Sequence, residues 1–149
     1  MKQHYINYAI ATIFIWIGCV CAISFMEAWL KFQAHGITTK LGLGIGQLVF
    51  YALNKVEIAC AVLVSICLFA SKITSKWFLG WPLLLLPLFI LGLQSSWLLP
   101  ALDHRADAII SGQELPKSRL HLWYVILEIV KVISLFISGM KLFRIKNEN

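Results

Sequence analysis

The stretch WFLGWPLLLLPLFILGLQSSWLLPAL, residues 77–102, contains no charged side chain and decides the class of this protein. A second run without charge, YINYAIATIFIWIGCVCAISFM, covers residues 5–26. A helix that crosses a membrane needs about 20 mainly apolar residues, because it rises about 1.5 Å per residue across about 30 Å of hydrocarbon. Both runs reach that length, so each predicts one transmembrane helix.

Two further apolar runs, residues 41–70 and 118–143, are interrupted by a few polar side chains. The chief ones are Asn54, Lys55 and Glu57 in the first run, and Glu128 and Lys131 in the second. Backbone groups in lipid must be satisfied within their own segment, so helices are expected here too. We predict an all-α, integral-membrane four-helix bundle with up-down-up-down topology, as one domain over residues 1–149. The predicted spans are about 5–28, 48–71, 77–100 and 118–141.

Prolines and polar residues set the expected ends of the third span. We expect Pro82 and Pro87 to kink it and Pro100 to end it. A polar connection, residues 101–117, then leads to the fourth span and is expected to lie over the outer end of the bundle.

The overall composition agrees with a membrane protein and argues against a nucleic-acid partner. Apolar residues make up 60% of the chain and charged residues 13%, whereas soluble domains average about 45–50% and about 25%. The net charge of +6 comes from residues placed between apolar runs, not along one stripe. A lipid bilayer is therefore the predicted partner, together with further copies of the chain or other subunits of a membrane complex.

The distribution of Lys and Arg predicts the orientation. Four spans place both termini and the second connection on one side. The basic residues divide almost evenly between the two sides, but the pairs Lys72/Lys76 and Lys141/Arg144 flank spans directly. Because basic residues next to spans favour the cytoplasm, we predict a protein of the cell (inner) membrane with both termini cytoplasmic.

Ionisable groups inside spans are energetically expensive, so they mark the candidate site. At 100° per residue, His121, Tyr124, Glu128 and Lys131 fall within about 80° on the fourth span. Asn54 and Glu57 share a face of the second span by the same arithmetic, whereas Lys55 points elsewhere. Glu57 and Glu128 lie about 20–23 Å from the inner ends of their spans, and His121, Gln94 and Glu27 are expected nearer the outer boundary.

These residues predict a polar pocket in the outer half of the bundle. Its proposed ligand-binding residues are Glu27, Lys31, Asn54, Glu57, Gln94, His121, Tyr124, Glu128 and Lys131. Such a pocket could bind or conduct a small polar solute, a proton or an ion, as a transport protein does. Two alternatives stay open: an accessory subunit whose ion pairs only fix helix register, and a small enzyme acting on a lipid or quinone.

No motif indicates a particular reaction, metal or cofactor. A nucleophile, base and orienting group cannot be assigned, so no catalytic residue is predicted. No metal site is predicted either, because the lysines would repel a divalent cation and the sequence has no H-E-x-x-H. The cysteines, Cys19, Cys21, Cys60 and Cys67, fit no zinc spacing and are interpreted as apolar filler.

Several segments resemble bacterial four-span membrane proteins of uncharacterised function. These segments are ISFMEAWLKF at residues 23–32 and LNKVE at residues 53–57. The run QSSWLLP at residues 94–100, followed by Arg105 and His121, is similar to the transmembrane protein 205-like group. That group has adjacent His and Tyr where His121 and Tyr124 are separated, and a glutamate where this chain has Leu99. The resemblance implies a multi-pass membrane protein, and it transfers no catalytic residue.

Overall fold

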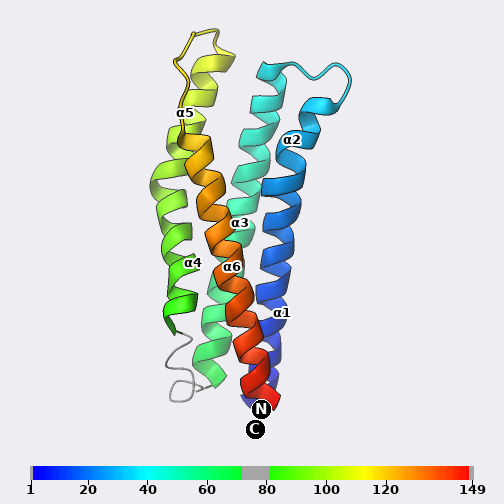
Figure 1. Cartoon of the computed structure of the whole chain (residues 1–149), viewed down its shortest axis with the longest axis vertical. Coiled ribbons are helices and arrows are strands. Elements are labelled where there is room, and N and C mark those ends of the chain that lie inside the picture. The colour runs from blue at the N-terminus through cyan, green and yellow to red at the C-terminus, as the bar shows by residue number, and fades with distance from the viewer. Residues whose placement is uncertain (1, 72–80, 148–149) are drawn as a thin grey trace.

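The computed structural model describes residues 2–71 and 81–147, and within these ranges the chain is helical and has no strand (Figure 1). The first helical rod comprises α1 (Lys2–Val20), the π-helical turn η1 (Cys21–Glu27), α2 (Ala28–Leu30) and the 3₁₀ turn η2 (Lys31–Gln33). The second is α3 (Thr39–Ser71). The third comprises α4 (Trp81–Leu93), the π-helical turn η3 (Gln94–Leu98) and α5 (Leu99–Ile110), and the fourth is α6 (Leu120–Asn147).

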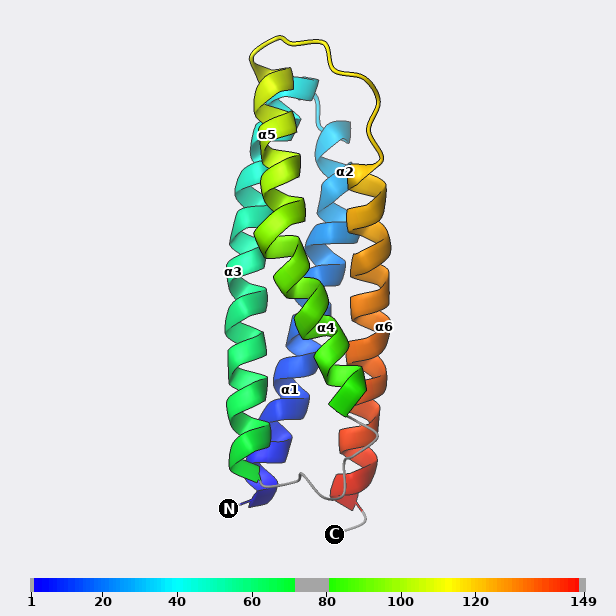
Figure 2. The ribbon, with the colours of Figure 1, turned by 90° about the vertical axis from the view of Figure 1, so that its left-hand side faces the viewer.

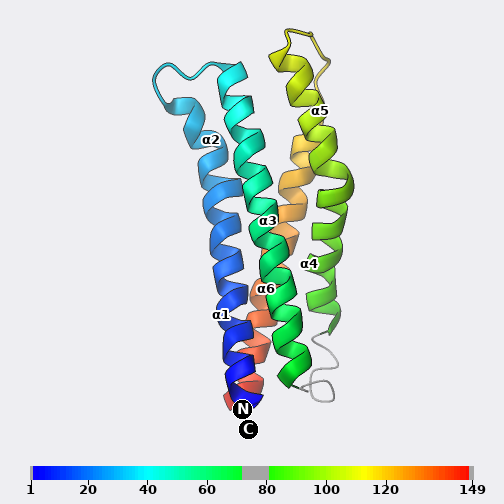
Figure 3. The same ribbon diagram turned by 180° about the vertical axis from the view of Figure 1, so that it is seen from behind.

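The four rods run side by side and alternate in direction, so both termini lie at one end of the bundle (Figures 1 and 2). α1 packs against α3 and α6, α4 packs against α6, and α5 packs against α3. Each rod therefore has two neighbours around a shared core, an arrangement that is also visible from behind (Figure 3). The predicted all-α architecture of four helices is confirmed for the described residues.

Four helical segments of the described chain are long and apolar enough to cross a membrane: Gln3–Gln33, Thr39–Ser71, Pro82–Ile110 and Leu120–Lys146. The predicted spans at residues 5–28 and 48–71 fall wholly inside the first two. The predicted start of the third span, residues 77–80, and the connection from Lys72 to Lys76 lie outside the described residues.

The expectation that Pro100 ends the third helix is wrong, because the helix continues to Ile110. Inside an α-helix the proline ring would meet the carbonyl of the preceding turn. The wider π-helical turn at Gln94–Leu98 precedes Pro100, which then occupies the first turn of α5, where its missing N–H is tolerated. Consequently the connection is shorter than expected, and residues 101–110 extend the bundle.

The bundle is apolar both inside and outside. Trp16, Leu53 and Leu135 are completely buried in the core. On the outer surface Phe69 is 82% exposed and Phe89 is 69% exposed. Large apolar side chains this accessible are unfavourable in water, so the outer surface is suited to contact with lipid or protein.

Candidate functional site

Five buried polar or aromatic side chains meet in the middle of the bundle, with every rod contributing at least one. This central cluster consists of Trp16, Glu57, Gln94, Glu128 and Lys131. The Lys131 ammonium lies 2.5 Å from Glu57 Oε1 and 3.1 Å from Glu128 Oε1. It also donates to Gln94 Oε1 at 2.8 Å. Lys131 therefore joins three of the four rods.

Neutral donors complete the contacts of the two carboxylates. Trp16 Nε1 donates to Glu57 Oε1 at 2.8 Å, and Gln94 Nε2 donates to Glu128 Oε1 at 3.2 Å. Glu128 and Lys131 have no exposed surface, and Glu57 and Gln94 are each 1% exposed. Counted from the ends near the termini, the cluster lies about 20–23 Å along the helices. The members of the cluster therefore contact one another directly and are closed off from the surface.

The formal charges of the central cluster do not cancel. Glu57 and Glu128 carry two negative charges in their ionised forms, and Lys131 supplies one positive charge. A buried charge without compensation is strongly unfavourable, and two carboxylates that share a site commonly retain one proton between them. In addition, Glu128 Oε2 is buried and has no hydrogen-bond partner among the described residues. The cluster is therefore short of one proton or one equivalent positive charge.

Tyr124 connects the central cluster to the far end of the bundle. It lies one helical turn before Glu128 on α6 and is 2% exposed. Its hydroxyl is close enough to interact with Glu128 and with the buried Ser24 of η1. The ring also packs edge-on against Phe50, with the two ring centroids 5.3 Å apart.

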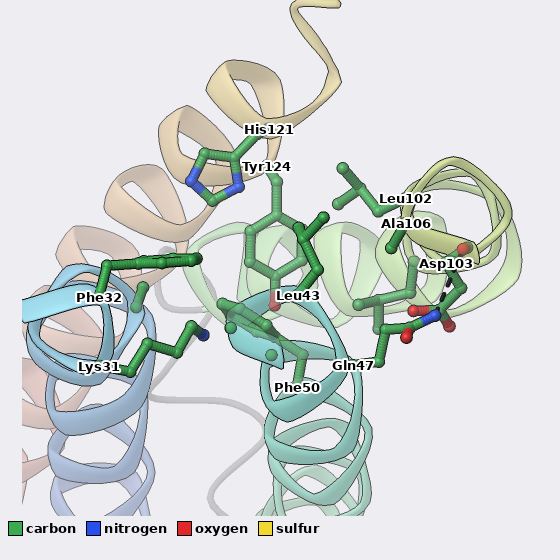
Figure 4. Close-up of a pocket in the computed structure, with 14 residues that line it drawn as sticks. Lys31, Phe32, Leu43, Gln47, Phe50, Leu102, Asp103, Ala106, His121 and Tyr124 are labelled. Carbon is green, nitrogen blue, oxygen red and sulfur yellow. Dashed lines mark hydrogen bonds between the residues drawn. The ribbon is translucent and has the colours of Figure 1, made fainter. Parts of the chain in front are cut away.

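A cavity of about 260 Å³ opens at the end of the bundle opposite the termini; we call it the distal cavity (Figure 4). Its lining comes from α2, η2, α3, α5 and α6 and is mainly apolar. The lining residues are Ala28, Lys31, Phe32, Gly42, Leu43, Gly46, Gln47, Phe50, Leu99, Leu102, Asp103, Ala106, His121 and Tyr124. Tyr124 is therefore shared by the distal cavity and the surroundings of Glu128.

Lys31 is the buried cation of the distal cavity. Its side chain is only 9% exposed, and its ammonium pairs with Glu27 at 3.2 Å along the same helix. The ammonium also lies 5.6 Å from the ring centres of both Phe32 and Phe50. In Figure 4 the Lys31 side chain points toward the space between the rings, with His121 above it.

The opposite wall of the distal cavity is held by hydrogen bonds between α3 and α5. Gln47 Nε2 donates to Asp107 Oδ1 at 2.8 Å and to the Asp103 backbone carbonyl at 3.3 Å. Lower down, Asn54 Nδ2 donates to Ser95 Oγ at 2.6 Å and links α3 to η3. Arg105 donates to the carbonyl of Pro116 and anchors the connection that leads into α6.

The predicted ligand-binding residues therefore separate into three groups. The first group is the central cluster, with Glu57, Gln94, Glu128 and Lys131. The second belongs to the distal cavity: Lys31, His121 and Tyr124 line it, and Glu27 pairs with Lys31. The third is Asn54, which bonds to Ser95. The prediction that Gln94 lies nearer the outer boundary than Glu128 is wrong, because Gln94 lies at the depth of Lys131. The third helix extends beyond Pro100, so the outer end of the bundle is farther from Gln94 than expected. Lys55 is exposed, as expected, and lies 4.4 Å from the Tyr51 ring centre.

Sequence reasoning did not identify the contribution of Trp16. Tryptophan is common near the ends of membrane helices, and Trp29 and Trp123 are exposed near helix ends. Trp16 instead lies in the middle of the first rod and donates to Glu57. A buried indole N–H needs an acceptor, so a tryptophan at the centre of an otherwise charge-free span was the available signal.

Metal coordination has no support within residues 2–71 and 81–147, where no three His, Cys, Asp or Glu side chains are grouped to hold an ion. All four cysteines are free thiols. Comparisons of the chain with protein-family models, curated proteins and solved structures give no match.

Proposed function

We propose that the chain is a multi-pass protein of the cell membrane that binds one proton on its central cluster and exchanges it toward the distal end. The observation that carries the proposal is the unequal charge of the cluster, two carboxylates against one ammonium, in a completely buried position. Among the small polar species considered from the sequence, a proton is the one that needs no free volume.

Tyr124 supports a route for this proton. Its hydroxyl lies beside Glu128, and its side chain lines the distal cavity. A hydroxyl both donates and accepts, so it can pass a proton between Glu128 and groups in the cavity by reorienting. Ionisable side chains inside membrane helices mark proton relays in pumps and transporters, where the chains contain Glu.

Several features support the membrane location included in the proposal. The outer surface of the bundle is apolar, and Trp29 and Trp123 are exposed near the distal helix ends, where interfacial tryptophans are favourable. Arg144 and Lys146 lie in the last turn of α6, which favours a cytoplasmic location for the termini. A homo-oligomer or a larger membrane complex would pack against the same apolar outer faces, and native mass spectrometry tests that part of the proposal.

Infrared spectroscopy of the protein in lipid nanodiscs tests for the proton. The wild type should show a protonated-carboxyl band that is absent from both Glu57→Gln and Glu128→Gln, since either variant leaves one carboxylate to balance Lys131. Asp107→Asn removes an exposed carboxylate and serves as the control. No band that responds to Glu57 or Glu128 at any pH at which the fold persists would contradict the proposal.

Hydrogen–deuterium exchange then separates proton exchange from a purely structural role. When the nanodiscs are transferred to D₂O, the protonated-carboxyl band of the wild type should shift to its deuterated position while the protein stays folded. Tyr124→Phe should keep the band and slow its shift, because the hydroxyl beside Glu128 is lost. A protonated-carboxyl band that shifts only when the protein unfolds would identify the cluster as a structural element and refute the exchange.

A further inference from the structure

The Lys31 ammonium in the distal cavity has unused hydrogen-bonding capacity. A lysine ammonium carries three N–H donors. Among the described residues, the Glu27 carboxylate is the one oxygen group within hydrogen-bond distance of it. The other close neighbours of the ammonium are the faces of Phe32 and Phe50. A cation that is 91% buried would bind a further anionic or accepting group strongly, because little water competes for it.

The electrostatic surroundings favour an anion at this point. Lys31 lies close enough to His121 for their charges to interact. A ligand oxygen between them could accept from both Lys31 Nζ and a His121 ring N–H. The acidic side chain on the far side of the cavity, Asp103, faces Gln47 and α3 rather than Lys31 (Figure 4).

The walls of the distal cavity favour a ligand in which the anionic group is attached to an apolar part. Leu43, Phe50, Leu99, Leu102 and Ala106 supply hydrocarbon surface. Ligand sites typically combine such walls with a few placed polar groups that fix orientation. At about 30 Å³ for each water-sized group, the cavity of about 260 Å³ accommodates about nine non-hydrogen atoms. This is the size of an acidic head group with a short alkyl chain. It is also the size of the head group and first carbons of an amphiphile with a longer chain.

We propose that the distal cavity binds the acidic head and the first carbons of a single-chain amphiphile, with Lys31 as the anion-binding residue. The head is a carboxylate or a phosphate, as in a fatty acid or an alkyl phosphate. The amphiphile enters from the outer leaflet, because the cavity opens at the end of the bundle opposite the termini. The inference uses the proposed membrane location but not the proposed proton exchange, since Glu128 does not line the cavity.

The test is a titration of the full-length protein in phosphatidylcholine nanodiscs with three probes of equal chain length: octanoate, octyl phosphate and 1-octanol. Native mass spectrometry counts the bound probes, and titration calorimetry gives the affinities. The two acidic probes should bind once per chain, and octanol should bind about 10–100-fold more weakly, which is the usual effect of losing a charge-assisted hydrogen bond. The ratio between octanoate and octyl phosphate identifies the preferred head.

Matched variants assign the effect to Lys31. Lys31→Gln should remove the preference for acids, whereas Lys40→Gln, an exposed lysine at the same end, should leave it intact. Glu27→Gln should strengthen acid binding several-fold, because the ammonium loses its competing anion. Ala106→Phe fills the cavity without changing its charge and should abolish binding of all three probes, which provides a second test if Lys31→Gln does not fold.

Equal binding of octanol and the acids would overturn the proposal, as would unchanged acid binding in both Lys31→Gln and Ala106→Phe. Glu128→Gln should bind octanoate like the wild type. A Glu128→Gln protein that binds octanoate but lacks the protonated-carboxyl band would support both proposals separately, and a wild type that shows the exchanging band without binding octanoate would overturn this one alone.

Discussion

Lys131 and Lys31 both point into the bundle, but their surroundings differ. The difference indicates a structural role for Lys131 and a ligand-binding role for Lys31. Lys131 is completely buried and has oxygen partners on α3, η3 and α6. Lys31 is nearly buried, but Glu27, its one oxygen partner within the described parts of the chain, lies on the same rod. Lys131 therefore holds rods together, whereas Lys31 makes no hydrogen bond or ion pair to another rod among the described residues and keeps donors available toward a cavity.

The comparison shows that burial alone does not distinguish a structural charge from a ligand-binding charge. What distinguishes the two lysines is the number of oxygen partners and whether empty volume adjoins them. In the central cluster the side chains of different rods contact one another directly. At the distal end the rods carry small or apolar residues such as Gly42, Gly46 and Ala106, and a cavity remains.

The largest expected effect is that of Lys131→Met. The substitution keeps the volume of the side chain and leaves Glu57 and Glu128 without a cation in a buried position. Removing one member of a buried ion pair costs about 3–5 kcal/mol of the free energy of unfolding. Denaturant titration in mixed micelles measures the loss. Lys55→Met removes an exposed lysine of α3 and should change stability by less than about 1 kcal/mol. Similar losses in both variants would contradict the role of Lys131.

The intermediate effect is that of Trp16→Phe in the central cluster. The ring that fills the core is partly kept, but Glu57 Oε1 loses its indole donor. We expect a loss of about 1–3 kcal/mol, because a buried acceptor gives up a hydrogen bond to a neutral donor. The same denaturant titration applies, with Trp123→Phe at an exposed position as the control. Octanoate binding should not change, and a weakened affinity would place Trp16 in contact with the distal cavity.

The smallest expected effect comes from a pair of glycines on α3. A methyl group at Gly42 would overlap the Phe32 ring, whereas nothing lies near the corresponding position at Gly44. Gly44→Ala should stabilise the helix by about 0.5–1 kcal/mol through helix propensity, and Gly42→Ala should gain less or lose stability. Because Phe32 lines the distal cavity, Gly42→Ala should also weaken octanoate binding. Equal stabilities and affinities for the two variants would show that the Phe32 side chain can adopt another conformation without cost.

Counting residues along a helix predicted which way the side chains of the candidate site face where the helices are regular. On α3 and α6, counting at 100° per residue directed Glu57, Glu128 and Lys131 to the interior, and they meet there. The first and third rods each contain a π-helical turn, which changes the direction in which all later side chains of that rod point. The third helix continues past Pro100 because this proline follows the π-helical turn and lies in the first turn of α5. The expected depth of Gln94 was wrong because it rested on a span that ended at Pro100.

The sequence by itself determined the four apolar helices and their antiparallel order. It also determined that ionisable side chains, which are energetically unfavourable in an apolar environment, lie inside these helices. These properties are local, since they depend on run length, hydrophobicity and residue spacing along one helix. The tertiary structure alone decided that Trp16 and Gln94 complete the central cluster and that Lys31 faces a separate cavity. Those outcomes depend on which side chains from different helices reach the same depth and how tightly they fill the space, and no single segment encodes either quantity.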